Sequence, residues 1–257
     1  MNPDTRVAVC CYEGDQHQVV EFMDLYTHHK CPIVVLSPEN SKANIPGVEN
    51  RHAGKRAYSG PDMLDRFMEY LKILLTFPEN HFFIADSDSF CLEPKLPDYL
   101  YENPDIVWSN MGYCDDVAAP QEGAAFTAFA VDCPHVSLGS PWFLSRKTIE
   151  ALLAVTDHVP YSTEALIYTD LYLVQLCHKA GLRWRGFYNR TSFRIDVTAD
   201  WATQQQREEA LQTGLSHARA GANMMHSIKS AATAQVLLTA YNTSMIAADN
   251  RYLRGKS

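Results

Sequence analysis

The alternation of short apolar runs with a helical stretch near the N-terminus most constrains the fold of this chain. Residues 6–12 and 31–36 are apolar runs of strand length, and residues 16–30 between them place apolar side chains at helical spacing. This order is typical of two parallel strands joined by a crossover helix. Because parallel sheets are covered by helices on both faces, we predict an α/β fold with a mostly parallel central sheet flanked by helices.

The rest of the chain continues this alternation. Further strands are expected at residues 81–85, 105–109, 141–145 and 183–187, and further helices at 61–75, 146–155, 170–180 and 227–248. Residues 40–60 are expected to form a polar loop, and residues 112–136 show no clear period, which predicts long loops and short edge strands. A chain of 257 residues is long enough to form one large α/β domain.

The composition excludes several classes of protein. The net charge of −8 disfavours sequence-independent binding of nucleic acid, which depends on neutralising phosphates. The seven cysteines are odd in number and form no C-x-x-C pair, so a disulfide framework or a thiolate zinc site is not expected. No apolar run reaches the roughly 20 residues of a membrane span, and the N-terminus has no signal-peptide pattern. We therefore expect a cytoplasmic protein.

Two aspartates follow the apolar run at residues 81–85. Asp86, Ser87 and Asp88 stand where a strand turns into a loop, and ligands of open α/β sheets bind at the carboxyl ends of strands. Carboxylate oxygens suit a hard cation such as Mg²⁺ or Mn²⁺. The sequence predicts a metal site here, although a polar turn after the strand would have the same sequence.

A second candidate group lies near the C-terminus, at His226 and Lys229. The imidazole of His226 is a candidate third metal ligand, and the ammonium of Lys229 a candidate partner of a phosphate. Taken alone, such a histidine is more often a core histidine or one that flanks a helix than a metal ligand, so the interpretation of His226 depends on its combination with the aspartates.

The succession of these features resembles the GT-A fold of metal-dependent glycosyltransferases. It comprises a β-α-β opening, a strand followed by Asp86-Ser87-Asp88, the segment 139–146, the acidic helix start Thr169-Asp170, and the spacing His226-x-x-Lys229. The resemblance spans residues 6–229. It implies one domain over residues 1–257, with residues 1–110 binding the nucleotide-sugar, 111–230 carrying the acceptor and catalytic half, and 231–257 forming a helical tail.

The resemblance also implies roles for individual residues. Asp88 and His226 would bind Mn²⁺ or Mg²⁺, with Asp86 contacting the metal or the ribose, and Ser87 between them. Residues near the nucleobase and the diphosphate would be Cys11, Tyr12, Glu13, Lys55, Arg56 and Lys229. The loop residues Lys55 and Arg56 fit a solvated loop equally well. The donor implied is a nucleotide-diphosphate sugar, with UDP favoured.

A base is needed only if the transfer inverts the configuration of the sugar. For this role we expect Asp170, with Glu164 as the second candidate. Thr169 or Asp170 as a plain helix cap is the alternative. Among the aromatic residues, Trp142 and Trp201 are the candidates for a wall of the acceptor site. The acceptor itself stays open between a glycan, a small molecule, a protein and a hydroxylated nucleobase.

Three other functions remain as alternatives. A nucleotidyltransferase also uses strand-end acids, a metal and a nucleotide, but residues 10–15 lack the glycine-rich basic loop of that class. A metal phosphoesterase would need more clustered His and Asp residues. An inactive nucleotide-sugar-binding protein would differ from an enzyme only in lacking turnover.

Overall fold

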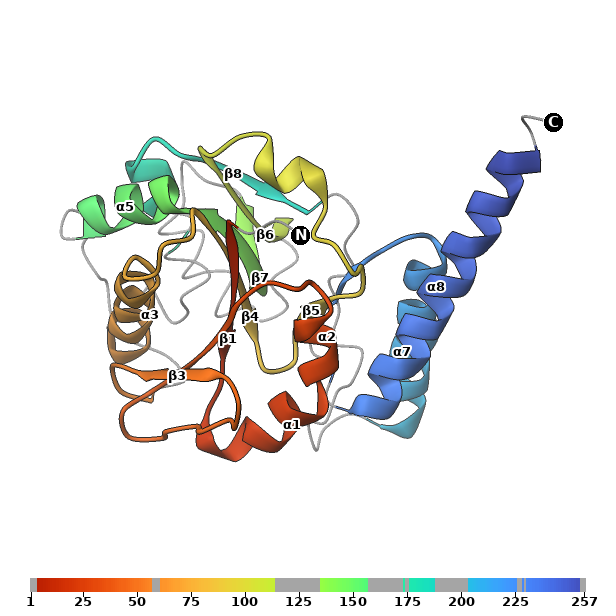
Figure 1. Ribbon diagram of the computed structural model, residues 1–257, viewed down its shortest axis with the longest axis horizontal. Coiled ribbons are helices and arrows are strands. Elements are labelled where there is room, and N and C mark those ends of the chain that lie inside the picture. Colours follow the sequence, from red (N-terminus) through yellow and green to blue (C-terminus); the bar gives the residue numbers. More distant parts are fainter. Residues whose placement is uncertain are drawn as a thin grey trace.

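A seven-stranded sheet forms the centre of the structure (Figure 1). The structure is a computed structural model, and it describes residues 4–56, 61–113, 135–156, 173, 176–187, 203–225, 228 and 230–254. The strand order is β3-β2-β1-β4-β7-β6-β8. The strands are β1 (Thr5–Cys10), β2 (Ile33–Ser37), β3 (Glu49–His52), β4 (His81–Asp86), β6 (Ile106–Tyr113), β7 (His135–Ser145) and β8 (Arg183–Gly186). Strand β7 runs antiparallel to β4 and β6, whereas the other neighbours are parallel. The predicted α/β fold class with a mostly parallel central sheet is confirmed.

Helices cover both faces of this sheet (Figure 1). One face packs on α1 (Gln16–Glu21), α2 (Met23–Thr27), α7 (Gln204–Arg219) and α8 (Ala231–Arg254), and the other on α3 (Pro61–Leu74) and α5 (Arg146–Val155). Successive side chains of a strand point to opposite faces, so Val7 and Val9 enter the first core and Ala8 enters the second. Short 3-10 helices occupy Glu13–Asp15 and Asp98–Tyr101.

In the central sheet, three strands were missed or cut short by the sequence pattern. Strand β3 lies within residues 40–60, which were expected to form a loop, because its polar side chains give no apolar alternation. It pairs in parallel with β2 at the sheet edge, where an exposed strand needs few apolar residues. Strands β6 and β7 extend beyond the expected 105–109 and 141–145, into residues where the sequence shows no clear period.

The helix expected over residues 16–30 is two short helices. The break falls at Phe22, whose φ of −93° and ψ of 3° leave the helical range. Phe22 is buried, and its ring packs edge-on against Phe90 at 5.4 Å between centroids. Apolar spacing continues through the break, so periodicity alone could not reveal it.

Two helix boundaries follow from local chemistry. Gly181, expected to end the helix at 170–180, has a φ of +66°, and residues 176–179 before it are helical. The helix expected from residue 227 instead begins at Ala231, since the Ser230 hydroxyl accepts a hydrogen bond from the Thr233 amide at 3.2 Å and caps it. Across the described residues, none of the helices combines the length and the apolar character that a bilayer crossing requires.

Candidate functional site

The Asp86-Ser87-Asp88 segment forms a tight turn at the carboxyl end of β4. The Ser89 amide donates to the Asp86 carbonyl at 3.0 Å, which closes the turn. The Ser140 hydroxyl of β7 accepts from the Asp86 amide at 2.9 Å and donates to the Ser89 hydroxyl at 2.7 Å. Ser89 in turn donates to Asp88 Oδ1 at 3.2 Å. The turn is therefore fixed to the neighbouring strand, and one oxygen of Asp88 is held by a hydroxyl.

This turn lies where the order of the parallel strands reverses. Cys10 at the end of β1 pairs with Asp86 on one side and with Leu36 of β2 on the other. Strand β2 follows β1 in sequence but lies on the side away from β4. Ligands of open α/β sheets bind outside the carboxyl ends of strands at such a reversal, so the predicted residues stand at the position that the fold favours for a ligand.

The two aspartates differ in exposure. Asp86 is half-buried, whereas Asp88 is 6% exposed. Their oxygen donors fit the preference of Mg²⁺ and Mn²⁺. Within the described residues, no group of three His, Cys, Asp or Glu side chains is arranged to hold a metal ion. Asp86 and Asp88 lie together in the turn, whereas His226, the third residue of the predicted set, lies outside the described residues, so the metal site stays a prediction.

A small ribbon connects this turn to the C-terminal part of the chain. Strand β5 (Phe90–Cys91) pairs antiparallel with β9 (Met224–Met225). The Leu92 amide donates to the Asn223 carbonyl at 2.8 Å, and the Ile228 amide donates to the Asp88 carbonyl at 3.0 Å. Residues on both sides of positions 226 and 227 are therefore bound to the segment that follows the turn. Sequence reasoning missed both strands because each has only two residues.

Two arginines surround Tyr12 at the end of β1. The Arg56 Cζ lies 4.6 Å from the centre of the Tyr12 ring, and the Arg66 Cζ lies 5.2 Å from it. Arg66 Nη1 also donates to the Lys55 carbonyl at 3.2 Å. Gly54, with a φ of +66°, lets this loop approach α3: a Cβ there would lie 2.7 Å from the Arg66 Cα. The loop and the helix together bring two cations to the carboxyl edge.

Arg66 is a candidate site residue that sequence reasoning did not identify. It lies on α3 outside the apolar stripe at residues 64, 67, 68, 71 and 74, so its position predicts a solvated side chain. In the structure it is 7% exposed. The loop at Gly54 and the Tyr12 ring both lie against it, and such contacts between distant residues give no signal in a single sequence.

The charges of this edge affect the groups beside it. Burial, followed by the Asp86 carboxylate, raises the pKa of the Cys10 thiol, and the Arg66 cation opposes this shift. Burial also raises the pKa of Tyr12 to about 12, and Arg66 again opposes it. The Tyr26 hydroxyl donates to the Asp86 carbonyl at 3.2 Å, and burial and then Asp88 raise its pKa. These thiol and phenol groups therefore stay protonated at neutral pH.

The other predicted residues near the nucleotide divide into two groups. Glu13 and Lys55 are exposed at this edge. Cys11 is 2% exposed, its side chain belongs to the apolar core, and burial raises its thiol pKa to about 12. Only the backbone of Cys11 is thus available to a ligand. The predicted Glu164, Asp170, Lys229 and Trp201 lie outside the described residues, as does His226.

The prediction for Trp142 was wrong. Trp142 pairs with Ile84 of β4 and Ser109 of β6, is 5% exposed, and packs against Phe67 of α3 at 5.4 Å between ring centroids. The alternation along β7 points its side chain into the core beneath α3 rather than towards an acceptor.

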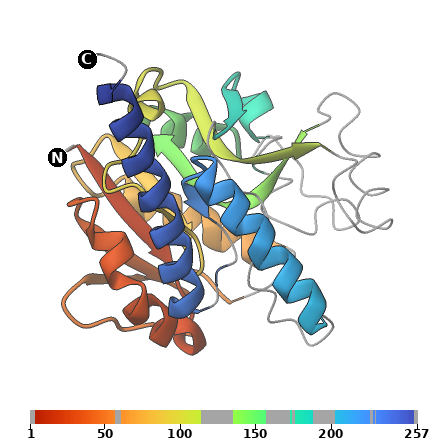
Figure 2. The same cartoon turned by 90° about the vertical axis from the view of Figure 1, so that its right-hand side faces the viewer.

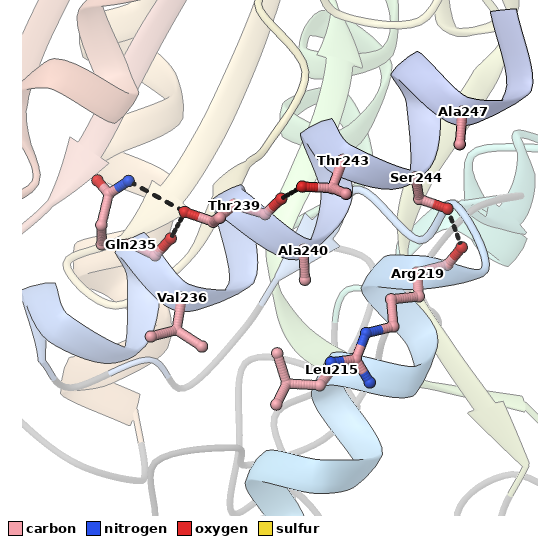
Figure 3. Close-up of a pocket in the computed structure, with 9 residues that line it drawn as sticks. All are labelled: Leu215, Arg219, Gln235, Val236, Thr239, Ala240, Thr243, Ser244 and Ala247. Carbon is pink, nitrogen blue, oxygen red and sulfur yellow. Dashed lines mark hydrogen bonds between the residues drawn. The ribbon is translucent and has the colours of Figure 1, made fainter. Parts of the chain in front are cut away.

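A cavity of about 600 Å³ lies between α7 and α8, and none of its lining residues belongs to the acidic turn or the arginine pair (Figure 3). Figure 2 shows the two helices side by side. The Ser244 hydroxyl of α8 donates to the Arg219 carbonyl of α7 at 2.5 Å. The cavity is lined mostly by aliphatic and hydroxyl side chains, so it offers little to a phosphorylated ligand.

The carboxyl edge therefore defines a Rossmann-like α/β protein with an acidic turn at the reversal of its strand order. No family model and no curated protein sequence matches the chain. Solved structures similar to it include that of the glycosyltransferase GlyE of Streptococcus pneumoniae TIGR4, at 14% identity and a TM-score of 0.44 over 88% of this chain and 55% of that one.

Two other similar structures have comparable scores. One, from Desulfovibrio desulfuricans G20, is described as a candidate nucleotide-diphospho-sugar transferase, at 9% identity and a TM-score of 0.41 over 84% of this chain and 96% of that one. The other is the inositol-1-phosphate CTP transferase of T. maritima, at 11% identity and a TM-score of 0.42 over 73% and 86% of the two chains. Likenesses below a TM-score of 0.5 are too low to assign a function.

Proposed function

We propose that this chain transfers a sugar from a nucleotide-diphosphate sugar to an acceptor hydroxyl, with a divalent cation at the acidic turn. The observation that carries the proposal is the position of Asp86 and Asp88 at the strand-order reversal, close to the arginine pair around Tyr12. Oxygen ligands for a hard cation and guanidinium groups for phosphate oxygens are the two chemistries that bind a diphosphate.

The residues of the acidic turn and the arginine pair have separate roles in binding the donor. Asp86, Asp88 and His226 hold Mn²⁺ or Mg²⁺, which when bound withdraws charge from the departing diphosphate. Arg56 and Arg66, beside the Tyr12 ring, attract the phosphate oxygens, with Lys229 as a further candidate. The resemblance to GT-A enzymes favours UDP as the nucleotide, with its base near Tyr12 and Glu13.

The acceptor hydroxyl forms the new bond to the anomeric carbon as the bond from that carbon to the diphosphate oxygen breaks. In an inverting transfer, Asp170, or Glu164 in its place, takes the hydroxyl proton. The two carboxylates are proposed from sequence alone. A glycan, a small molecule, a protein or a hydroxylated nucleobase would each offer a suitable hydroxyl.

Calorimetry with UDP, GDP, CDP and dTDP, each with and without Mn²⁺, tests the proposal. We expect one diphosphate to bind only with metal, and Asp88→Asn and His226→Ala to weaken that binding strongly. Asp105→Asn is the matched control, because Asp105 forms a surface ion pair with Lys147 at 2.7 Å. Binding that ignores both the metal and Asp88 would exclude the proposal.

Turnover assays separate the alternatives. A glycosyltransferase releases a nucleoside diphosphate from the sugar donor, whereas a nucleotidyltransferase consumes a nucleoside triphosphate and releases pyrophosphate. Binding with neither product across a broad acceptor panel would favour an inactive binding protein.

A further inference from the structure

Gln18 of α1 makes a buried hydrogen bond to a residue 210 positions away in the sequence. Its Nε2 donates to the Ile228 carbonyl at 2.7 Å, and its side chain is 6% exposed. Ile228 itself is fully buried. The bond therefore joins the first helix of the chain to the segment between β9 and α8, in a place that water does not reach.

The other backbone group of Ile228 is bound to the acidic turn. Its amide donates to the Asp88 carbonyl at 3.0 Å. Gln18, Ile228 and Asp88 thus form a continuous chain of hydrogen bonds from α1 through the C-terminal segment to the turn. Ile228 stands between the predicted metal ligand His226 and the predicted phosphate ligand Lys229 in the sequence.

Among the described residues, the strand pairing that precedes this segment is short. Strand β9 has only two residues, and its pairing with β5 is correspondingly short. Segments with few backbone hydrogen bonds open locally at low cost. A buried carbonyl that loses its donor keeps its full desolvation cost, so loss of the Gln18 amide favours states in which Ile228 moves away from Asp88.

We propose that Gln18 is a positioning residue, which holds the Ile228 segment against the acidic turn and so keeps the C-terminal residues in place for the metal and the diphosphate. This role rests on the proposed function. Gln18 acts through Ile228 and is not itself expected to contact the cation or the nucleotide.

Gln18→Met tests the role, since methionine has a similar length and shape but no donor. We expect the dissociation constant of the Mn²⁺-dependent diphosphate to rise about tenfold, and hydrogen exchange of the Ile228 amide to accelerate by a similar factor. Exchange of the Val35 amide, in the middle of the buried strand β2, is expected to stay unchanged. Hydrogen exchange of the Ile228 amide measures how often this segment opens, even if nucleotide affinity changes for another reason.

The matched control is Ser145→Ala. Ser145 also makes buried hydrogen bonds to the backbone, donating to the Pro104 carbonyl at 2.6 Å and accepting from the Thr148 amide at 3.0 Å, but at the opposite end of β4. The substitution Ser145→Ala lowers the stability of the protein without changing a contact of the Ile228 segment. Nucleotide affinity and hydrogen exchange of the Ile228 amide should therefore both stay at the wild-type level.

Equal behaviour of Gln18→Met and the wild type in both measurements would overturn the positioning role, as would equal losses in Gln18→Met and Ser145→Ala. A wild-type protein that binds no diphosphate refutes the proposed function instead. In that case, exchange at Ile228 alone decides whether Gln18 holds the segment.

Discussion

The two edges of the central sheet carry different arrangements of charge. At the amino edge, opposite charges pair: Arg6 makes two hydrogen bonds to Glu79, at 2.9 and 3.1 Å, and its guanidinium lies 3.9 Å from the centre of the Phe77 ring. At the carboxyl edge, Asp86 and Asp88 share one turn and two arginines lie around the Tyr12 ring, where the charges of Asp86 and Arg66 shift the pKa of Tyr12 in opposite directions.

This difference separates stability from function. The buried ion pair at the amino edge holds neighbouring segments together whether or not a ligand is present, whereas the acidic turn and the two guanidinium groups lie at a strand-order reversal, where α/β sheets bind ligands. Departures from the most stable local arrangement are expected mainly at such functional sites. Changes at the amino edge should therefore lower the free energy of unfolding, and changes at the carboxyl edge should lower affinity for a ligand.

The largest effect is expected at Glu79. Glu79→Gln leaves the buried Arg6 without its charge partner, which costs roughly 3–5 kcal/mol, and the melting temperature should fall by about 10 °C. Glu49, 3.6 Å from Arg6 and more exposed, is the control, because Glu49→Gln removes a surface partner and should cost less than about 1 kcal/mol. Chemical denaturation measures both. Equal losses of unfolding free energy in the two variants would show that the buried pair with Glu79 contributes no more than the exposed pair with Glu49.

Acid should also act on the amino edge, through His29. Burial, followed by the nearby His28, lowers the pKa of His29 to about 3. Between pH 6.5 and 3 the unfolded chain binds a proton that the folded chain does not, so stability falls as the pH falls. The loss from this group reaches about 3 kcal/mol at pH 4, at 1.36 kcal/mol per pKa unit.

Denaturation curves between pH 7 and pH 4 measure this slope. His29→Gln should flatten it, because glutamine does not titrate in this range. His17, which is exposed, supplies the control, since His17→Gln should leave the slope of the wild type. A slope that is identical in all three proteins would place the acid sensitivity elsewhere.

The carboxyl edge should respond in binding rather than stability. Asp88→Asn removes one carboxylate from the turn. If this carboxylate binds the metal as proposed, Mn²⁺-dependent diphosphate binding should weaken about 100-fold, or about 2.7 kcal/mol. Its free energy of unfolding without ligand should change by less than about 1 kcal/mol, because asparagine keeps the side-chain oxygen that accepts from the Ser89 hydroxyl. A large loss of stability with unchanged binding would reverse the proposed difference between the edges.

The sequence predicted those parts of the fold whose signals are local. The apolar runs located β1, β2 and β4, Pro61 located the start of α3, and Gly181 the end of a helix. These signals arise from residues close together in the chain, each with a direct physical cause. The position of Asp86 and Asp88 at a strand end followed from the same local pattern.

The parts that sequence reasoning missed depend on contacts between distant residues. The ribbon of β5 and β9 joins two dipeptides more than 130 positions apart, and such short strands have no period. Trp142 has the same sequence neighbours, Pro141 and Phe143, whether it faces an acceptor or the core, and its pairing with β4 shows that it faces the core. Gln18 and Arg66 are polar residues on helices, where burial comes from elements that the sequence does not place.

The smallest effect is expected at Arg66, where the two edges can be compared with the same change of charge. Arg66→Gln should weaken binding of the diphosphate about tenfold, about 1.4 kcal/mol, because one of the two guanidinium groups near the phosphates is lost. Arg51→Gln makes the same change on β3, where the exposed guanidinium pairs with Glu49 at 2.7 Å. A tenfold loss in both variants would indicate a long-range effect of net charge, whereas a loss in Arg66→Gln alone assigns the effect to the carboxyl edge. Calorimetric titration at two ionic strengths separates the two, since long-range attraction weakens with salt and a contact in a partly buried site weakens less.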